Sequence, residues 1–371
     1  MKILHIISSG GMYGAEAVIL NLSRVLNQGS HRSSIGVFAN SSNLNVQLHE
    51  QAAAEGIESN LIQCRGQVDS MTFNEIRDLV ARIKPDIVHA HGYKADIYVY
   101  LALRRLRIPL VSTCHTWYDN NLTLSLYGSA DRVVLRRFAR VIAVSSEVKQ
   151  RLLKAGVRPQ NIAQIQNGID LRPFDNVSPS LREALAVGDA PVIGLVGRLS
   201  TEKGVDIFLR AAARVLPDFP RARFVVIGEG PDRHELESLI DELGIRQNVT
   251  MVGRRNDMPA VYASFDLMVS ASRKEGLPIA LLEGMASGLP LVATSAGEIP
   301  AIVQHGMTGL LVPAEDADLL ASAITELLQD PDRRRQFGAA GRQRIETEFS
   351  AQRMTADYLR AYQAVLRGKT K

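Results

Sequence analysis

Short apolar runs alternate with longer amphipathic stretches along the first half of the chain. The apolar runs predict strands at residues 3–7, 34–38, 57–62, 87–89, 110–113, 141–144 and 162–165. Between them, apolar residues recur at helical spacing, for example over 15–26, 74–83 and 147–155. Near-continuous apolar strands that alternate with helices are typical of a parallel sheet covered on both faces. This half therefore predicts a doubly wound α/β domain.

A second series of the same kind follows the polar, proline-containing stretch 176–180. Its expected strands are 192–196, 224–227, 249–252, 267–270, 291–293 and 310–312, and its expected helices include 205–216, 233–243 and 319–328. The predicted fold class is α/β, with two Rossmann-like doubly wound domains in tandem. We expect the domains to span residues 1–176 and 186–349.

Composition narrows the class of protein. The 371 residues suffice for two domains, and 46% hydrophobic with 22% charged residues is usual for a soluble globular protein. A net charge of +4 is too small for a nucleic-acid coat but fits anionic substrates or an anionic membrane surface. The only cysteines, Cys64 and Cys114, lack metal-type spacing and are expected in the core. No apolar run reaches the ~18 residues of a spanning helix, so we expect a cytoplasmic protein.

The stretch from Glu275 to Glu283 joins a predicted strand to a helix that should end near Gly288. Pro278 suits the first helical turn, and the amides of residues 279–281 would face a helix N-terminus where phosphates bind. The two glutamates could accept hydrogen bonds from hydroxyls beside such a phosphate. An ordinary crossover whose Glu283 faces solvent explains this stretch equally well.

Two cations follow the first strand of the second domain. Arg198 and Lys203 would both lie at the carboxyl edge of its sheet, where a guanidinium and an ammonium can neutralise a diphosphate. Such neutralisation stabilises a diphosphate leaving group when no metal supplies it. The alternative is two surface cations near Glu202.

The first domain offers a glycine turn and histidines at strand ends. Gly10, Gly11 and Gly14 follow the first strand, but the pattern is not G-x-G-x-x-G, and no acid follows strand 34–38, so a dinucleotide site is weakly supported. His115 follows strand 110–113, and His89 and His91 end another strand in the same way. Such histidines could bind a sugar or move a proton, or could simply be packed residues.

Acidic and basic clusters yield two further expectations. The D-x-D triplets at 316–318 and 330–332 precede helical patterns and are interpreted as helix caps, and no His/Cys/Asp cluster has metal-ligand spacing. We therefore expect no metal. Arg132, Arg136 and Arg140 recur at intervals of four and would share one helical face, either solvated or touching an anionic membrane.

Taken together, these residues resemble the GT-B glycosyltransferases, specifically the retaining family 4. The resemblance covers nearly the whole chain and is strongest over about 191–313. Its motifs are Gly10-Gly11…Gly14, His115, 167–170 (NGID), Gly197-Arg198…Lys203-Gly204, 228–231 (GEGP), Glu275-x7-Glu283 and Gly306-x2-Gly309.

The resemblance implies a role for each matching position. Arg198 and Lys203 would grip the diphosphate of a UDP- or GDP-sugar, and Glu275 would bind hydroxyls of the transferred sugar. Glu283 would accept from the nucleotide ribose, and His115 would lie beside the anomeric carbon. The remaining donor contacts would come from Gly10, Gly11, Arg254, Gly276, Leu277, Pro278 and Ile279.

The resemblance also implies a mechanism and an architecture. The hexose would move by front-face displacement with retention, without metal or cofactor, in a cleft between the domains that closes on the donor. The helix within 350–371 would pack back on the first domain. Acceptor contacts would come from Tyr13, His91 and Trp117, and the expected acceptor is a saccharide or a lipid-linked saccharide of polysaccharide or lipopolysaccharide biosynthesis, with no nucleic acid bound.

The alternative functions are a nucleotide-sugar 2-epimerase and a sugar-nucleotide sensor without catalysis. A nucleotide-sugar 2-epimerase shares the architecture and the need for a diphosphate clamp, but it would form no acceptor-dependent product. A sugar-nucleotide sensor without catalysis conflicts with the joint presence of His115, Arg198, Lys203 and Glu275. A phosphorylase would need a pyridoxal-phosphate lysine in a recognisable context, which the sequence lacks.

Overall fold

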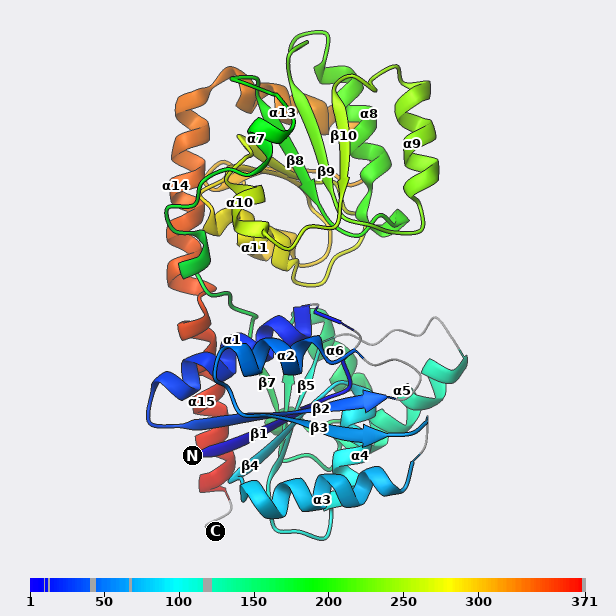
Figure 1. The fold of residues 1–371 in the computed structure, drawn as a ribbon, viewed down its shortest axis with the longest axis vertical. Coiled ribbons are helices and arrows are strands. Elements are labelled where there is room, and N and C mark those ends of the chain that lie inside the picture. Colours follow the sequence, from blue (N-terminus) through cyan, green and yellow to red (C-terminus); the bar gives the residue numbers. More distant parts are fainter. Residues whose placement is uncertain (10, 13, 41–44, 67–68, 116–121, 369–371) are drawn as a thin grey trace. The chain divides into compact units, whose positions relative to one another are not determined.

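The chain folds into two α/β units, shown in Figure 1. The computed structural model describes residues 1–371 except 10, 13, 41–44, 67–68, 116–121 and 369–371. Unit 1 comprises Met1–Ile169 together with Ala351–Lys371, and unit 2 comprises Asp170–Ser350.

Unit 1 is built on a parallel sheet of seven strands in the order β3-β2-β1-β4-β5-β6-β7. The strands are β1 (Lys2–Ile7), β2 (Arg32–Asn40), β3 (Ser59–Cys64), β4 (Ile87–His91), β5 (Leu110–Cys114), β6 (Arg140–Ala143) and β7 (Ile162–Gln164). Strand order reverses at the β1–β4 neighbours, and in an open α/β sheet ligands bind outside the carboxyl ends at such a point. The register there sets His5 opposite His89 and Ile7 opposite His91.

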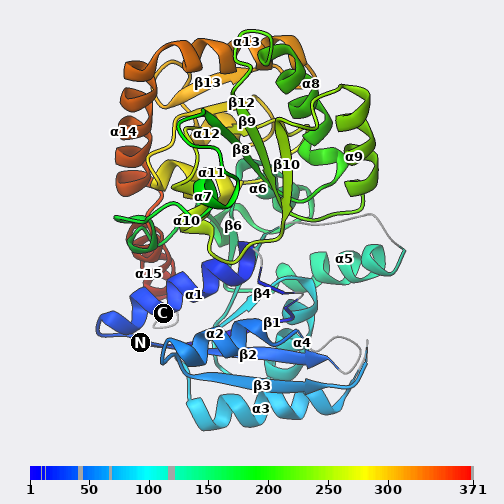
Figure 2. The same cartoon turned by 45° about the horizontal axis from the view of Figure 1, so that its top comes forward.

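Helices cover both faces of this sheet, as Figure 2 shows from a second side. They are α1 (Gly14–Gln28), α2 (Gln47–Ala54), α3 (Met71–Ile83), α4 (Tyr93–Leu103), α5 (Leu122–Leu135), α6 (Ser146–Lys154), the short η1 (Pro159–Asn161) and α15 (Ala351–Arg367). On one face, Ile3 packs with Val18 and Leu22 of α1 and with Tyr358 and Tyr362 of α15. The last helix of the chain is therefore part of the first unit's core.

Unit 2 repeats this design with a parallel sheet of six strands in the order β10-β9-β8-β11-β12-β13. The strands are β8 (Val192–Val196), β9 (Arg223–Ile227), β10 (Val249–Gly253), β11 (Leu267–Ser270), β12 (Leu291–Thr294) and β13 (Gly309–Val312). The helices are η2 (Arg172–Phe174), α7 (Leu181–Ala184), η3 (Thr201–Lys203), α8 (Val205–Val215), α9 (Arg233–Glu242), α10 (Met258–Tyr262), α11 (Ile279–Ala286), α12 (Ile299–Ile302), α13 (Ala317–Gln329) and α14 (Pro331–Glu348).

The predicted fold class is confirmed, and the predicted strand bounds differ from the observed ones by about two residues at most. Two of the predicted helix caps are also confirmed. The side chain of Asp316 accepts from the amide of Leu319, and that of Asp330 accepts from the amide of Arg333. Cys64 and Cys114 are buried free thiols, as expected of core residues.

The prediction that Arg132, Arg136 and Arg140 share one helical face is wrong. Helix α5 ends at Leu135, so Arg136 lies in the following turn and Arg140 is the first residue of β6. Arg136 donates through Nε to the carbonyl oxygen of Ala155 (2.7 Å), and Arg140 donates to that of Gln160 (2.8 Å). The chain leaves the helix because Phe138, 1% exposed, enters the core before β6 starts. The three arginines share no helical face, which removes the basis for a membrane contact through them.

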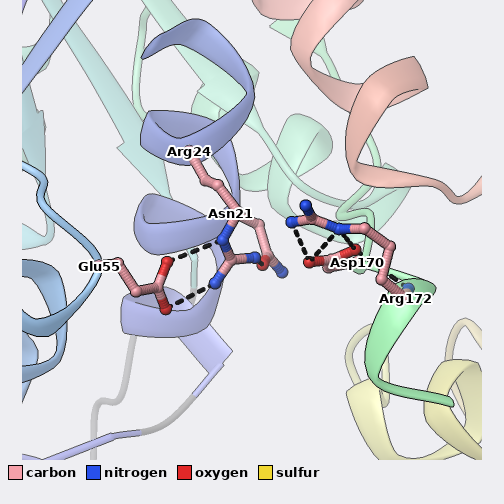
Figure 3. A network of polar contacts seen from close by, with 5 residues as sticks. All are labelled: Asn21, Arg24, Glu55, Asp170 and Arg172. Carbon is pink, nitrogen blue, oxygen red and sulfur yellow. Dashed lines mark hydrogen bonds and ion pairs between the residues drawn. The ribbon is translucent and has the colours of Figure 1, made fainter. Parts of the chain in front are cut away.

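Figure 3 shows one ion pair from each unit. In unit 1, Arg24 of α1 donates two hydrogen bonds to the carboxylate of Glu55, each 2.7 Å long, and so joins α1 to the end of α2. In unit 2, Arg172 donates to both carboxylate oxygens of Asp170 at the start of the unit. In the described part of the chain, every helix is too short or too polar to cross a bilayer.

Candidate functional site

The carboxyl edge of the unit 2 sheet brings two of the predicted site residues into contact. Lys203 ends the turn η3 that follows β8, and Glu275 lies beyond β11. The Nζ atom of Lys203 is 2.5 Å from Oε1 of Glu275, and the Ser272 hydroxyl donates to the same oxygen at 2.8 Å. The Glu275 side chain is only 9% exposed. An ammonium and a nearly buried carboxylate therefore lie side by side at this edge.

Two glycines allow these loops to approach one another. Gly204 adopts a left-handed conformation (φ 61°), and a Cβ there would lie 2.0 Å from the carbonyl oxygen of Ala271. Gly297 has φ 54°, and its Cβ would lie 1.8 Å from the carbonyl oxygen of Glu275. Neither position has room for a side chain. The loop that carries Glu275 is thus packed against the backbone of two glycines.

Arg273 braces the same loop, although sequence reasoning did not single it out. Its guanidinium donates to both carboxylate oxygens of Asp206 on α8 (2.7 and 2.8 Å) and to the carbonyl oxygen of Thr201 (2.7 Å). The hydrogen bonds from Arg273 hold the pKa of Asp206 below its ordinary value. Because Thr201 begins the turn that ends at Lys203, Arg273 ties the Lys203 segment to the Glu275 segment.

The other predicted cations are exposed at or near this edge. Arg198 follows β8 by two residues, and Arg254 follows β10 directly. The backbone beneath Arg198 is packed tightly, because a Cβ on Gly228 would lie 1.9 Å from the carbonyl oxygen of Gly197. Both arginines are thus free to reach a ligand outside the strand ends.

Helix α11 begins one residue later than predicted. Pro278 is its N-cap residue in an extended conformation (ψ 107°), and Ile279 is the first helical residue. The amide of Leu281 donates to the carbonyl oxygen of Pro278 (3.1 Å), so it is not one of the free amides that the sequence predicted. Gly276 is exposed and Leu277 half-buried ahead of this end.

Glu283 does not face solvent as an ordinary crossover residue would. It lies in the second turn of α11, half-buried, and its Oε2 accepts a hydrogen bond from the Tyr262 hydroxyl at 2.8 Å. Burial raises the pKa of Glu283, and the hydrogen bond from Tyr262 opposes that rise. Tyr262 is fully buried and was missed, because an aromatic residue in a short helix carries no sequence signal of a polar partner.

The glycine turn of unit 1 follows β1 and is held by a buried polar cluster. Gly11 has φ 141°, and the Ser9 side chain accepts from the Gly11 amide (3.2 Å) and donates to Oε1 of Glu16 (2.9 Å). Glu16 is 4% exposed in the first turn of α1. Neither Ser9 nor Glu16 was predicted. Of the predicted site residues, Gly10, Tyr13 and Trp117 lie outside the described residues.

Four histidines gather on and beside the neighbouring strands β1, β4 and β5 of unit 1. His5 Nδ1 lies 3.0 Å from His91 Nε2, and His91 Nδ1 lies 3.4 Å from His115 Nε2. His89 is not at the strand end as predicted but two residues inside it, where its ring nitrogens contact the Tyr362 hydroxyl (2.7 Å) and the Thr113 hydroxyl (2.8 Å). His5 was missed because its spacing from the others is visible only in the folded sheet.

Burial keeps these imidazoles neutral. Loss of solvation lowers the pKa of His5 to about 3 and that of His115 to about 4. Desolvation also lowers the pKa of His89 and of His91 well below the ordinary value, and the neighbouring rings add to the effect. At neutral pH, His115 therefore presents an uncharged ring at the sheet edge.

The nitrogens of His5, His89 and His91 lie within 4.8 Å of one another, close enough to raise the question of a metal. A metal needs a lone pair from each ring. Both ring nitrogens of His89 already contact hydroxyls, and both of His91 contact other imidazoles. A metal would have to displace these contacts, so the cluster is better described as a hydrogen-bonded network.

Family models match the two units in turn. The model described as Glycosyltransferase Family 4 matches residues 12–172, and the one described as Glycosyl transferases group 1 matches residues 178–344.

Among curated proteins, the alpha-D-kanosaminyltransferase of Streptomyces kanamyceticus is 30% identical over 266 residues, covering 67% of this chain and 69% of that protein. A GDP-mannose-dependent alpha-(1-6)-phosphatidylinositol monomannoside mannosyltransferase of Mycobacterium tuberculosis is 32% identical over 248 residues, covering 62% of this chain and 64% of that protein. The matched region thus spans about two thirds of the length of these relatives.

Among solved structures, Alr3699/HepE of Anabaena in complex with UDP superposes with a TM-score of 0.84 at 23% identity. The match covers 98% of this chain and 100% of that one. The same protein is also solved with UDP-glucose. At this identity the likeness shows the fold alone.

Proposed function

Because this chain belongs to the GT-B glycosyltransferases of group 1, family 4 type, which use nucleotide sugars, we propose that it transfers a hexose with retention and without a metal. The observation that carries the proposal is the contact of Lys203 with Glu275 at the carboxyl edge of the unit 2 sheet. It joins a phosphate-binding cation to a hydroxyl-binding carboxylate, the two groups that a sugar diphosphate requires at its two ends.

Lys203 and Arg198 would neutralise the diphosphate. The Lys203 side chain is 30% exposed and can turn toward an incoming phosphate, and Arg198 is exposed on the same edge. Charge that develops on the leaving diphosphate would be stabilised by these two cations, which takes over the role of a divalent metal. We therefore expect transfer in the presence of a chelator.

Glu275 would bind the hydroxyls of the transferred sugar. When Lys203 moves to phosphate, Oε1 of Glu275 keeps its hydrogen bond from Ser272, and the carboxylate gains acceptor capacity for sugar hydroxyls. A carboxylate held in this way suits binding better than covalent attack. We therefore propose front-face displacement, in which the leaving phosphate takes the proton of the acceptor hydroxyl and the anomeric configuration is retained.

The donor would be a UDP- or GDP-sugar, and the acceptor a saccharide or a lipid-linked saccharide. Two findings support this range: the structural relative solved with UDP-glucose, and the GDP-mannose-dependent relative whose named acceptor is a phosphatidylinositol monomannoside. A role in polysaccharide assembly follows from this acceptor class. Acceptor recognition would come from unit 1, whose sheet edge carries His115 and the Gly11 turn.

The test is a donor panel of UDP-, GDP- and ADP-sugars with saccharide and lipid-linked acceptors, in the presence of EDTA. We expect acceptor-dependent release of the nucleoside diphosphate with one donor, and a product whose anomeric proton coupling matches that of the donor. Inversion would contradict front-face displacement. Loss of activity in EDTA that Mg²⁺ restores would contradict the role given to the two cations.

Lys203→Arg is the matched control for Lys203→Ala. The Ala variant removes a charge-assisted contact worth ~1.5–3 kcal/mol, so its kcat/KM should fall by about ten- to a hundredfold. The Arg variant keeps the charge and should retain more activity than the Ala variant. Near-normal turnover in Lys203→Ala would refute the assigned clamp.

A further inference from the structure

Three histidines of unit 1, His5, His91 and His115, form a hydrogen-bonded chain that ends at His115. His5 is fully buried in the middle of β1, His91 is the last residue of β4, and His115 follows β5. The contacts run from His5 Nδ1 to His91 Nε2 (3.0 Å) and from His91 Nδ1 to His115 Nε2 (3.4 Å). Each link thus joins the Nδ1 atom of one ring to the Nε2 atom of the next.

The protons on this chain can be counted. All three rings are neutral at pH 7, so each carries one N–H. Each ring-to-ring contact needs one proton, which leaves the third proton at one end of the chain. It lies either on Nε2 of His5 or on Nδ1 of His115. In the first arrangement all three rings are Nε2–H tautomers, and in the second all three are Nδ1–H tautomers.

The buried end of the histidine chain, at Nε2 of His5, decides between these two arrangements of protons. Nε2 of His5 is completely buried and has no hydrogen-bond partner among the described residues. An orphaned N–H in a protein interior is rarer than an under-satisfied acceptor, because a bare donor loses its full solvation. The half-buried His115 lies at the sheet edge, where an N–H can meet water or a ligand.

We propose that His91, backed by His5, is a positioning residue that fixes His115 as the Nδ1–H tautomer, so that His115 is a hydrogen-bond donor to substrate. Its use in catalysis rests on the proposed transferase function. His115 would then donate to a sugar hydroxyl or to a leaving-group oxygen instead of taking a proton as a base. His91, expected from the sequence to contact the acceptor, would act through His115 instead.

The neighbouring rings keep the chain in place. The His89 ring centroid lies 4.1 Å from that of His91, and His89 is itself held by the hydroxyls of Thr113 and Tyr362. The Thr113 hydroxyl also lies 3.1 Å from that of Tyr358 on α15. These hydroxyls form a second, separate network. Tyr362→Phe removes one of its members without touching the His5–His91–His115 chain, and so provides a matched control.

The experiment is a long-range ¹H–¹⁵N correlation spectrum of the ¹⁵N-histidine-labelled protein at neutral pH. This spectrum distinguishes Nδ1–H from Nε2–H rings, and single substitutions assign the signals. We expect Nδ1–H patterns for His5, His91 and His115 in the wild type and in Tyr362→Phe. An Nε2–H pattern for His115 in the wild type overturns the proposal. The tautomer is read on the folded wild-type protein, and this measurement needs no activity.

Two variants of His91 test the positioning role. In His91→Asn, the side-chain amide takes the place of the Nδ1 donor, so His115 should remain Nδ1–H and kcat should stay near the wild-type value. In His91→Leu, the donor is lost, His115 should populate both tautomers, and kcat should fall by about tenfold with little change in KM, as expected for one lost hydrogen bond. Equal losses in both variants with an unchanged His115 tautomer would show that His91 contacts substrate itself.

The outcomes separate this inference from the proposed function. An Nδ1–H His115 in a protein that transfers no sugar from any donor leaves the histidine chain standing and refutes the transferase role. An active transferase whose His115 is Nε2–H supports the transferase role and refutes the inference about the histidine chain.

Discussion

The four neutral histidines make unit 1 sensitive to acid. A histidine whose pKa is depressed by folding binds fewer protons in the native than in the unfolded state. Its contribution to stability is therefore complete above the unfolded pKa of about 6.5 and is lost as the pH falls toward the folded pKa. His5 has a folded pKa of about 3 and His115 of about 4, and His89 and His91 are also shifted well downward.

The size of the effect follows from this linkage. At pH 5, each unfolded histidine gains ~2 kcal/mol from protonation that the folded ring does not share, or about 8 kcal/mol for four rings. Asp96 acts in the opposite direction, because burial and the Asp131 carboxylate raise its pKa well above the ordinary value. Because folded Asp96 binds a proton that the unfolded chain does not, it restores at most ~3 kcal/mol of stability between pH 7.5 and 5. The net loss is about 5 kcal/mol, a large part of a domain's usual stability.

Hydrogen exchange with increasing denaturant measures this loss unit by unit. Peptides from β1 and β4 report on unit 1, and peptides from β8 and β9 report on unit 2, whose two histidines, His234 and His305, lie outside the buried cluster. We expect the opening free energy of β1 and β4 to fall by about 5 kcal/mol from pH 7.5 to pH 5, and that of β8 and β9 to change much less.

Asp96→Asn is the control that tests whether the titration of Asp96 opposes that of the histidines. The amide can still donate to Asp131, but the opposing titration is removed, so the acid-induced loss in unit 1 should grow to about 8 kcal/mol. A loss below about 2 kcal/mol in the wild-type protein would mean that the histidines are charged or solvated in the folded state, and the account of a neutral cluster would be wrong.

Three further predictions concern unit 2. Gly297→Ala places a Cβ 1.8 Å from the carbonyl oxygen of Glu275 and should reduce both stability and transfer. Gly188 has a nearly equal φ of 55° with open space around it, so Gly188→Ala should lower stability by about 1 kcal/mol and leave transfer unchanged. Thermal unfolding and initial rates compare the two variants. Tyr262→Phe removes the hydrogen bond to Glu283 and should lower stability by ~1 kcal/mol and weaken nucleotide binding, as calorimetry would show; unchanged affinity would separate Glu283 from the nucleotide. Arg273→Ala should lower kcat/KM while Lys203 and Glu275 are intact, and full activity would show that the brace is dispensable.

The sequence predicts the fold well because apolar periodicity is a local signal. Runs such as 192–196 and 267–270 match β8 and β11 in full, and the strand–helix alternation leads directly to two parallel sheets. The arginine spacing at 132–140 led to a wrong prediction, because the helix was extended past Leu135. There the burial of Phe138 and the start of β6 override the helical spacing. Boundary errors of this kind arise where tertiary packing competes with a local pattern.

The candidate site was predictable only where its residues follow strand ends. Arg198, Lys203, Glu275 and His115 were singled out in this way. The partners of these residues were not found, because their contacts form only in the folded chain. Ser272 bonds to Glu275 within one loop, and Arg273 of that loop bonds to Thr201 of another. Tyr262 reaches Glu283 from a short helix, and His5 meets His91 only through the β1–β4 register. Contacts between elements leave no periodic trace in one sequence.

The central claim is that the carboxyl edge of unit 2 binds a nucleoside diphosphate sugar through Lys203. Calorimetric titration of the wild type and of Lys203→Ala with UDP, GDP and their sugar derivatives in EDTA tests it most directly. We predict metal-independent binding of one nucleotide class to the wild type, and binding weakened at least about tenfold in the variant, equivalent to ~1.4 kcal/mol. Equal affinities in the two proteins, or binding only after Mg²⁺ is added, would contradict the account.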